Sequence, residues 1–256
     1  MSVIWCAGMY GSGSTWVFNV MRGLAAIDSA RPVHALFASS MADLARVTEE
    51  GSVHVIKSHD LPDDAAVLLH RQQPRVVTTI RDPRDAVVSL MLYQGFPFGL
   101  ALAAVNRSAR FVAATAQRAG ALVLRYESGF TENAESIARI AEAIGARVDA
   151  AAAARIFAEN SRAAVERLIG SLDTLSRAQR GQVTGDVYDP ETQWHKHHGG
   201  RTGEVGRWRR AMPEMHIREI EVMLGDWMDQ AGYERSATAK AASSTARLGG
   251  VDFKFD

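Results

Sequence analysis

Residues 8–16 read Gly-Met-Tyr-Gly-Ser-Gly-Ser-Thr-Trp and directly follow the apolar run of residues 3–7, Val-Ile-Trp-Cys-Ala. A buried strand that ends in glycines lets the backbone turn sharply, so consecutive N–H groups can point at an anion. Apolar residues then recur at helical spacing, and the N-terminus of such a helix presents free N–H groups and a positive dipole to the same anion. The stretch therefore predicts a strand, a phosphate-binding loop and a helix in succession.

The glycine spacing allows a nucleotide site but disfavours an ordinary ATP or GTP hydrolase. Gly8 and Gly13 match the first half of the pattern G-x-x-x-x-G-K-[ST], whereas Ser14 stands where that pattern has lysine. Taken alone, the loop could also be a glycine-rich turn without a ligand. Any anion site must be local, because 29 Lys and Arg residues balance 29 Asp and Glu residues.

Size and composition predict one globular domain spanning residues 1–256. The chain is 47% apolar, which suffices for a large buried core. The single cysteine, Cys6, lies in the first predicted strand and suits a reducing compartment. No apolar stretch approaches the roughly 18 residues of a membrane span. We therefore expect a cytoplasmic protein without a transmembrane segment or a nucleic-acid partner, and a homodimer is left open.

Short apolar runs alternate with helical patterns, which predicts a three-layer α/β/α fold around a central parallel sheet. The predicted strands occupy residues 3–7, 53–56, 76–80 and 121–124. Further helices are expected at residues 131–144, 149–168 and 213–231, and nothing in the first two indicates catalysis. Periodicity fades over residues 170–206, which indicates a long loop or lid, and residues 232–256 should form a loosely packed tail.

Polar residues follow two of the predicted strands, at the sheet edge where α/β folds bind ligands. Lys57 and His59 end the second strand, and Arg81 ends the third. Pro83 fits the first turn of the next helix, which places Ser89 about two turns along it. Arg81 and Ser89 could therefore contact one phosphate group.

These motifs resemble those of the sulfotransferases that use 3′-phosphoadenosine 5′-phosphosulfate (PAPS). The family's phosphosulfate loop, Y-P-K-S-G-T-T-W, is similar to residues 9–16, and its K-T-H-L-P segment to residues 57–62, with one inserted residue. Its R-N-P-K-D segment and a following serine resemble residues 81–85 and Ser89. Y-E-D is similar to residues 126–128, and R-K-G-x-x-G-D-W-K to residues 201–209. The resemblance covers most of the chain, and its strength lies in the order and spacing of the five elements.

The resemblance implies a role for each matching residue and no metal ion. His59 would be the general base that removes the proton of an acceptor hydroxyl, and Lys57 would stabilise charge on the transferring sulfuryl group. The N–H groups of the loop from Gly11 through Ser12 and Gly13 to Thr15 would act with Lys57, and Ser14 and Thr15 would hydrogen-bond the 5′-phosphate. Trp16 would stack on the adenine, and Tyr126 would touch the adenine end. Arg81, Ser89 and Arg201 would hold the 3′-phosphate, and the neighbouring Thr202 and Gly203 are also expected to bind the donor.

Three residues depart from the family pattern. Gly11 replaces the loop lysine, Thr202 replaces a lysine, and Arg207 stands where aspartate is usual. The leading hypothesis is still a PAPS-dependent sulfotransferase acting on a hydroxyl of a glycan, a lipid or a small molecule. The glycine spacing keeps open a P-loop phosphotransferase that uses ATP and magnesium, and the absent loop lysine keeps open a non-catalytic nucleotide-binding protein.

Three further features allow two interpretations each. Residues 194–200, Trp-His-Lys-His-His-Gly-Gly, could bind a metal, but we favour a mobile lid, because neighbouring histidines in a loop point apart and no acidic or cysteine partner is expected nearby. Residues 96–98, Phe-Pro-Phe, could form an acceptor wall or belong to the core. Arg84 is expected at the surface.

Overall fold

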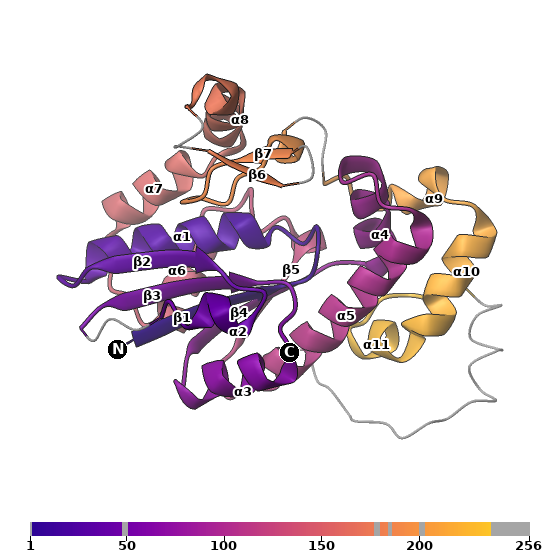
Figure 1. The fold of residues 1–256 in the computed structure, drawn as a ribbon, viewed down its shortest axis with the longest axis horizontal. Helices are drawn as coiled ribbons and strands as arrows, with labels where there is room; N and C mark the ends of the chain where they lie inside the picture. The colour runs from indigo at the N-terminus through magenta and orange to yellow at the C-terminus, as the bar shows by residue number, and fades with distance from the viewer. Residues whose placement is uncertain (1, 48–50, 177–179, 184–185, 200–202, 237–256) are drawn as a thin grey trace.

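The computed structural model describes residues 2–47, 51–176, 180–183, 186–199 and 203–236. Its centre is a five-stranded parallel sheet with the strand order β2-β3-β1-β4-β5 (Figure 1). The strands are β1 (Ser2–Gly8), β2 (Val33–Phe37), β3 (Val53–Ser58), β4 (Arg75–Ile80) and β5 (Leu122–Arg125). Helices cover both faces of this sheet, which confirms the predicted three-layer fold.

Side chains of β1 alternate between the two faces of the sheet. Val3, Trp5 and Ala7 pack in one cluster with residues of α3 (Asp63–Arg71) and α5 (Phe98–Ala116). Ile4 and Cys6 pack in the opposite cluster with α1 (Ser14–Asp28) and α6 (Glu135–Ile144). Because both faces are buried, every residue of β1 from Val3 to Ala7 is apolar, and the strand ends at Gly8, where the loop begins.

One strand of the central sheet and two helix breaks were not predicted. The five residues of β2 are half-buried at the sheet edge, so its apolar run is short and contains a histidine. The helix expected at residues 149–168 is divided into α7 (Ala150–Glu159) and α8 (Arg162–Ser171), because Ser161 caps the second helix. The helix expected at residues 213–231 is divided into α10 (Glu214–Met223) and α11 (Gly225–Gln230).

The segment predicted as a long loop or lid contains regular structure within its described part. The strands β6 (Gly181–Val183) and β7 (Asp186–Tyr188) form an antiparallel pair, flanked by the short helices η2 (Leu172–Thr174) and η3 (Lys196–His198). This strand pair lies beside α8 and above α1 (Figure 1). The other short elements are α2 (Met41–Leu44), η1 (Tyr126–Ser128) and α9 (Trp208–Ala211).

Arg84 is buried, so its expected surface position is wrong. It lies on α4 (Pro83–Tyr93), forms ion pairs of 2.7 Å with both Asp82 and Glu221, and stacks on Trp208 at 3.9 Å. The sequence could not show this, because Glu221 reaches Arg84 from α10, 137 positions away. A buried cation requires such partners, and here they join α4 to α10.

The aromatic segment at residues 96–98 belongs to the core. Phe96 and Phe98 pack against the cluster built by α4, α5, α10 and α11, and Phe98 stacks on His216 with ring centroids 3.7 Å apart. The beginning of the predicted loose tail is also packed, since Tyr233 is buried and Ser236 hydrogen-bonds to Glu221. Residues 237–256 lie outside the described part of the chain.

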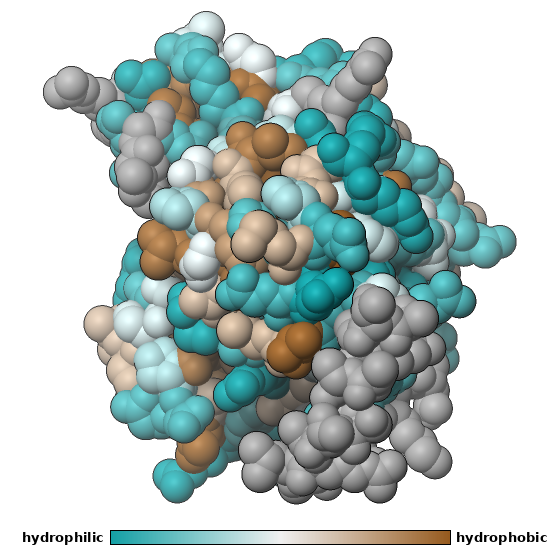
Figure 2. Space-filling view, turned by 90° about the vertical axis from the view of Figure 1, so that its right-hand side faces the viewer, coloured by the Kyte–Doolittle hydropathy of each residue, from teal (hydrophilic) through white to brown (hydrophobic). Residues whose placement is uncertain are grey.

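The face over α9, α10 and α11 mixes apolar and polar residues (Figure 2). Exposed apolar side chains on these and adjoining elements include Leu92, Met215 and Val222, but polar residues separate the apolar areas in this view. The homodimer therefore stays a prediction. None of the described helices combines the length and the hydropathy that crossing a bilayer requires.

Candidate functional site

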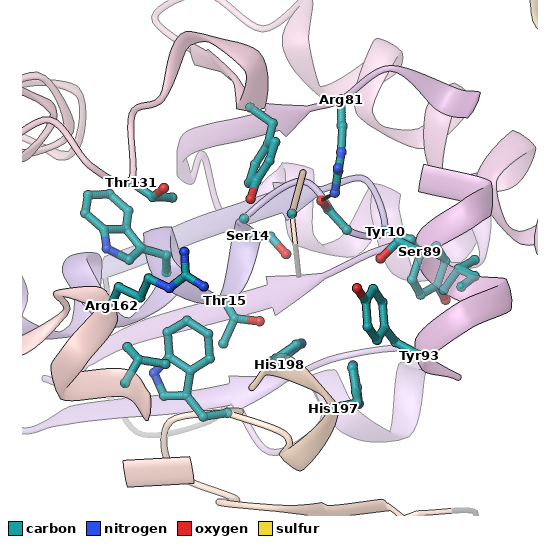
Figure 3. A pocket seen from close by; sticks show the side chains of 18 of the residues that line it. Tyr10, Ser14, Thr15, Arg81, Ser89, Tyr93, Thr131, Arg162, His197 and His198 are labelled. Atoms are coloured by element: carbon teal, nitrogen blue, oxygen red, sulfur yellow. Dashed lines mark hydrogen bonds between the residues drawn. The ribbon is translucent and has the colours of Figure 1, made fainter. Parts of the chain in front are cut away.

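A cavity of about 230 Å³ opens beside the loop that follows β1. Residues from many separate segments line it: Tyr10, Gly11, Gly13, Ser14, Thr15, Trp16, His59, Arg81, Ser89, Tyr93, Tyr126, Arg162, Trp194, His197, His198 and Gly203 are among them. Figure 3 shows Ser14 and Thr15 between Arg162 on one side and the group of Arg81, Ser89 and Tyr93 on the other. The site therefore lies at the carboxyl ends of the parallel strands, as predicted.

The loop after β1 depends on two glycines in the left-handed region. Gly11 has a φ of 67° and Gly13 a φ of 79°, and Gly13 begins α1 without a capping side chain. The first N–H groups of α1, including those of Ser14 and Thr15, have no partner in the preceding turn of helix. Together with the helix dipole, these donors are of the kind that binds anions at helix N-termini.

Ser12 anchors the loop and does not line the cavity. Its side chain is fully buried, and its hydroxyl donates to the carbonyl of Met9 at 2.7 Å and lies 2.6 Å from the hydroxyl of Thr79. The hydroxyl thus ties the loop to β4. In this position the Ser12 side chain points away from the cavity lining and serves to hold the loop.

Arg81 and Ser89 lie against the same point of the loop. A Cβ built at Gly11 would be 3.1 Å from the Ser89 hydroxyl oxygen and 3.6 Å from Arg81 Nη1. Arg81 Nη1 donates to the carbonyl of Gly11 at 2.8 Å, Nη2 donates to the carbonyl of Glu204 at 2.9 Å, and the guanidinium stacks on Tyr126 at 4.5 Å. Its buried Nε has no hydrogen-bond partner among the described residues, so a donor remains for an anion.

Aromatic residues form the other wall of the cavity. Trp16 is buried, and its Nε1 donates to the carbonyl of Asn160 at 2.9 Å, which fixes the orientation of the indole. Tyr126 leaves room only for glycine at position 203, since a Cβ there would lie 1.9 Å from its hydroxyl oxygen. Gly203 thus reaches the cavity as predicted, whereas Arg201 and Thr202 lie outside the described residues.

His59 is held in one tautomer by the loop. Its Nδ1 lies 2.7 Å from the carbonyl of Gly8, and its ring stacks on Tyr10 with centroids 4.4 Å apart. Because a carbonyl only accepts, Nδ1 carries the proton and Nε2 keeps a lone pair. Burial, and secondarily the charge of Lys57, lowers the His59 pKa to about 3, so the ring is neutral at physiological pH.

Lys57 stands behind the cavity wall. Its side chain is buried, and its Nζ donates to the hydroxyl of Thr15 at 2.8 Å. Burial lowers its pKa to about 8, so the ammonium form still predominates near pH 7. Lys57 does not line the cavity itself, but its ammonium group contacts Thr15, which does.

Arg162 is a lining residue that the sequence analysis missed. It begins α8, in a segment where nothing indicated catalysis, and its Nε donates to Glu166 at 3.0 Å. His197 and His198 line the cavity from η3, within the segment that we favoured as a lid. No local motif marks Arg162, because a charged residue at a helix start is common on protein surfaces.

The histidine segment also has an acidic partner that we did not expect. Asp186 lies beside His195 and His197, at 2.7 and 2.6 Å from their Nδ1 atoms. The chain reversal after β7, where Tyr188 pairs with His195, brings this carboxylate to histidines nine and eleven positions away. The expectation of no acidic partner is therefore wrong.

These features define a three-layer α/β fold with a glycine-containing loop and cationic side chains at the same sheet edge. Solved sulfotransferase-related structures share this fold. Mouse sulfotransferase SULT7A1 complexed with PAP matches 95% of this chain and 88% of its own, at 15% identity and a TM-score of 0.58. Retinol dehydratase complexed with retinol and PAP matches 91% of this chain and 83% of its own, at 15% identity and a TM-score of 0.60.

A second retinol dehydratase structure, with androsterone and inactive cofactor PAP, matches 92% of this chain and 83% of its own, at 16% identity and a TM-score of 0.57. No protein-family model and no curated protein matches the sequence. The similarity therefore establishes the sulfotransferase fold, at a sequence identity too low to transfer an activity.

Proposed function

We propose that this protein is a PAPS-dependent sulfotransferase that modifies a hydroxyl group. The observation that carries the proposal is the convergence of the loop, Arg81 and Ser89 with His59 and Lys57 around one cavity and its wall. The fold comparisons support it, since those proteins contain PAP, adenosine 3′,5′-bisphosphate, the donor without its sulfuryl group. The specific reaction, the donor and the site roles below are parts of this proposal.

The residues of the cavity fit the two anionic ends of such a donor. The N-terminus of α1 at Ser14 and Thr15 would bind the 5′-phosphate, and Lys57 would add positive charge through Thr15. Arg81 and Ser89 would bind the 3′-phosphate, for which the buried Nε of Arg81 provides a donor. Trp16 and Tyr126 would contact the adenine.

His59 would remove the proton of the acceptor hydroxyl through Nε2. Its tautomer is suitable, because the bond from Nδ1 to Gly8 leaves Nε2 basic. Its low pKa follows from burial and from the positive charge of Lys57. Anionic groups bound at the loop would favour the protonated ring and raise that pKa, which strengthens the base when the donor is present. Bound PAPS would supply the sulfuryl group.

Because Gly11 replaces the loop lysine of the family, Lys57 and Arg81 are the cations nearest to the loop among the residues that match the family motifs. Both touch the loop directly, through Thr15 and Gly11. Transition-state charge would therefore be stabilised mainly by these groups and by the helix N-terminus. The acceptor remains a glycan, lipid or small-molecule hydroxyl, and action as a single cytoplasmic domain remains a prediction.

Transfer of ³⁵S from labelled PAPS to a panel of hydroxyl compounds tests the proposal. We expect transfer by the wild type and a loss of at least a hundredfold in His59→Ala, because general base catalysis contributes on the order of 10²–10⁴-fold. PAP affinity should be retained in that variant. Undiminished transfer by His59→Ala would rule out this base, and PAP binding without transfer to any compound would favour the non-catalytic alternative.

The phosphotransferase alternative is less consistent with the site. Ser14 occupies the lysine position of the ATP-binding pattern and contributes no positive charge. Tight binding of ATP that requires magnesium, together with no binding of PAP, would restore that alternative.

A further inference from the structure

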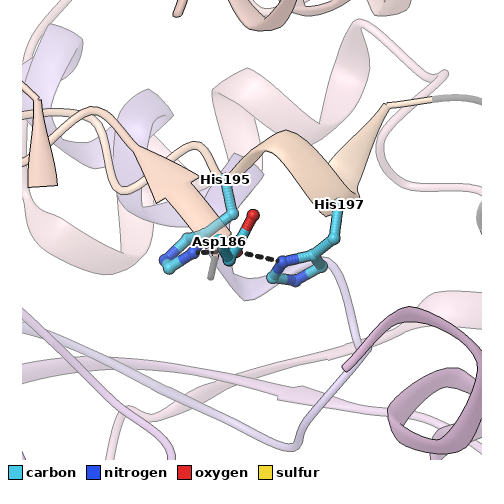
Figure 4. Close-up of side chains that lie close together, drawn as sticks. All are labelled: Asp186, His195 and His197. Atoms are coloured by element: carbon cyan, nitrogen blue, oxygen red, sulfur yellow. Dashed lines mark hydrogen bonds and ion pairs between the residues drawn. The ribbon is translucent and has the colours of Figure 1, made fainter. Parts of the chain in front are cut away.

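Asp186, His195 and His197 form a compact group beside the cavity (Figure 4). Asp186 Oδ2 lies 2.7 Å from His195 Nδ1 and 2.6 Å from His197 Nδ1, and the three potential ligand atoms lie within 4.8 Å of one another. All three side chains are half-buried. Among the described residues, this is the single cluster of three histidine, cysteine or acidic side chains with such geometry.

The local fold holds the three side chains in this convergent arrangement. Tyr188 of β7 pairs with His195 as an isolated bridge, and the N–H of Asp189 donates to the carbonyl of Trp194 at 2.9 Å. The His195 ring stacks on Tyr188 with centroids 4.7 Å apart and an interplanar angle of 14°. The chain reversal between residues 188 and 195 therefore orients His195 toward the carboxylate before any ligand is bound.

The chemistry of the three atoms suits a transition-metal ion. The carboxylate accepts from both imidazoles, so both Nδ1 atoms point at the same oxygen. Two imidazole nitrogens and one carboxylate oxygen are ligands that Zn²⁺ accepts in proteins, commonly with a fourth position for water or another ligand.

We propose that Asp186, His195 and His197 bind a divalent transition-metal ion, with Zn²⁺ as the best match. In the structure each neutral imidazole donates its Nδ1 proton to Asp186. For the ion to bind, each ring must shift this proton to Nε2, and the ion then takes the position of the two protons between the Nδ1 atoms and Asp186. His198 is not a ligand in this arrangement, because its Nδ1 accepts the backbone N–H of His195 at 3.1 Å. Since His197 also lines the cavity, the ion would lie at the cavity edge.

Titration of the tag-free, full-length protein with Zn²⁺, without any nucleotide, tests this site independently of the proposed function. Calorimetry and elemental analysis after dialysis should give one equivalent of zinc, whereas Mg²⁺ should not bind. Asp186→Asn and His197→Gln should each weaken binding at least tenfold. His216→Gln is the matched control, because His216 stacks on Phe98 away from this cluster.

A second measurement uses only the wild type, in case a variant fails to fold. X-ray absorption of the zinc complex should show two imidazole ligands at about 2.0–2.1 Å. The proposal is overturned if the wild type binds no zinc, if the bound zinc lacks two imidazoles, or if folded Asp186→Asn and His197→Gln bind as the control does. In those cases the group is a hydrogen-bonded triad alone.

Discussion

Replacement of Arg81 by alanine tests how the cavity grips its ligand. Arg81 donates to the carbonyls of Gly11 and Glu204 at 2.8 and 2.9 Å, and its buried Nε is left for an anion. A charge-assisted hydrogen bond contributes about 1.5–3 kcal/mol. At about 1.4 kcal/mol for each factor of ten, its loss should weaken PAP binding by roughly 10- to 150-fold. Loss of the bond to Gly11 would loosen the loop and act in the same direction.

The assay is calorimetric titration with PAP at one fixed salt concentration. Arg155→Ala is the matched control, because the Arg155 side chain is 62% exposed, pairs with Glu159 and lies outside the cavity. Arg81→Lys should give an intermediate affinity, since it keeps the charge and loses the planar fork. A folded Arg81→Ala variant that binds PAP as tightly as the wild type would refute the assigned anion contact.

Three further results are expected. The His59 pKa, followed by NMR, should be about 3 in the free protein and higher with PAP, because bound negative charge favours the imidazolium; a fall or no change would contradict this. Gly11→Ala and Gly95→Ala should each lower the free energy of unfolding by about 1–2 kcal/mol, since both glycines have a φ of 67°. Only Gly11→Ala should also weaken PAP binding. The added methyl group would lie 3.1 Å from the Ser89 hydroxyl oxygen, whereas a methyl group at position 95 would meet no atom within 4 Å. Equal PAP affinities of the two variants would argue against this. Between about pH 8 and 10.5 the unfolded chain holds a proton that folded Lys57 has lost, so Lys57 by itself should raise the free energy of unfolding with pH by up to about 3 kcal/mol. Burial raises the pKa of Cys6 to about 12, which acts in the opposite direction above about pH 9 in the wild type and in Lys57→Met alike. The difference in free energy of unfolding between the wild type and Lys57→Met, measured by chemical denaturation, should therefore rise with pH; a difference that does not change with pH would contradict this.

Much of the site could be predicted because its signals are local. The loop glycines, the polar residues at the strand ends and Pro83 at the start of α4 each lie within a few positions of the element that they mark. Parallel strands then bring their carboxyl ends to one edge, so Arg81 and His59 share a cavity without any long-range pattern.

The features that were missed depend on contacts between distant segments. Arg84 is buried because Glu221 approaches from α10, and Asp186 meets His197 because the chain reverses between Tyr188 and His195. Arg162 reaches the cavity because Ser161 interrupts what looked like one helix. Propensity and periodicity describe single segments, so they could not show any of these three contacts.

We infer that one cavity binds a nucleotide at both its 5′- and 3′-phosphates. Comparing the affinities of the wild type for PAP and for AMP, which lacks the 3′-phosphate, tests this inference without knowledge of the acceptor. We expect PAP to bind at least tenfold more tightly in calorimetric titration, because the contact with Arg81 should contribute at least about 1.5 kcal/mol. Equal affinities for the two nucleotides, or no binding of PAP, would contradict it.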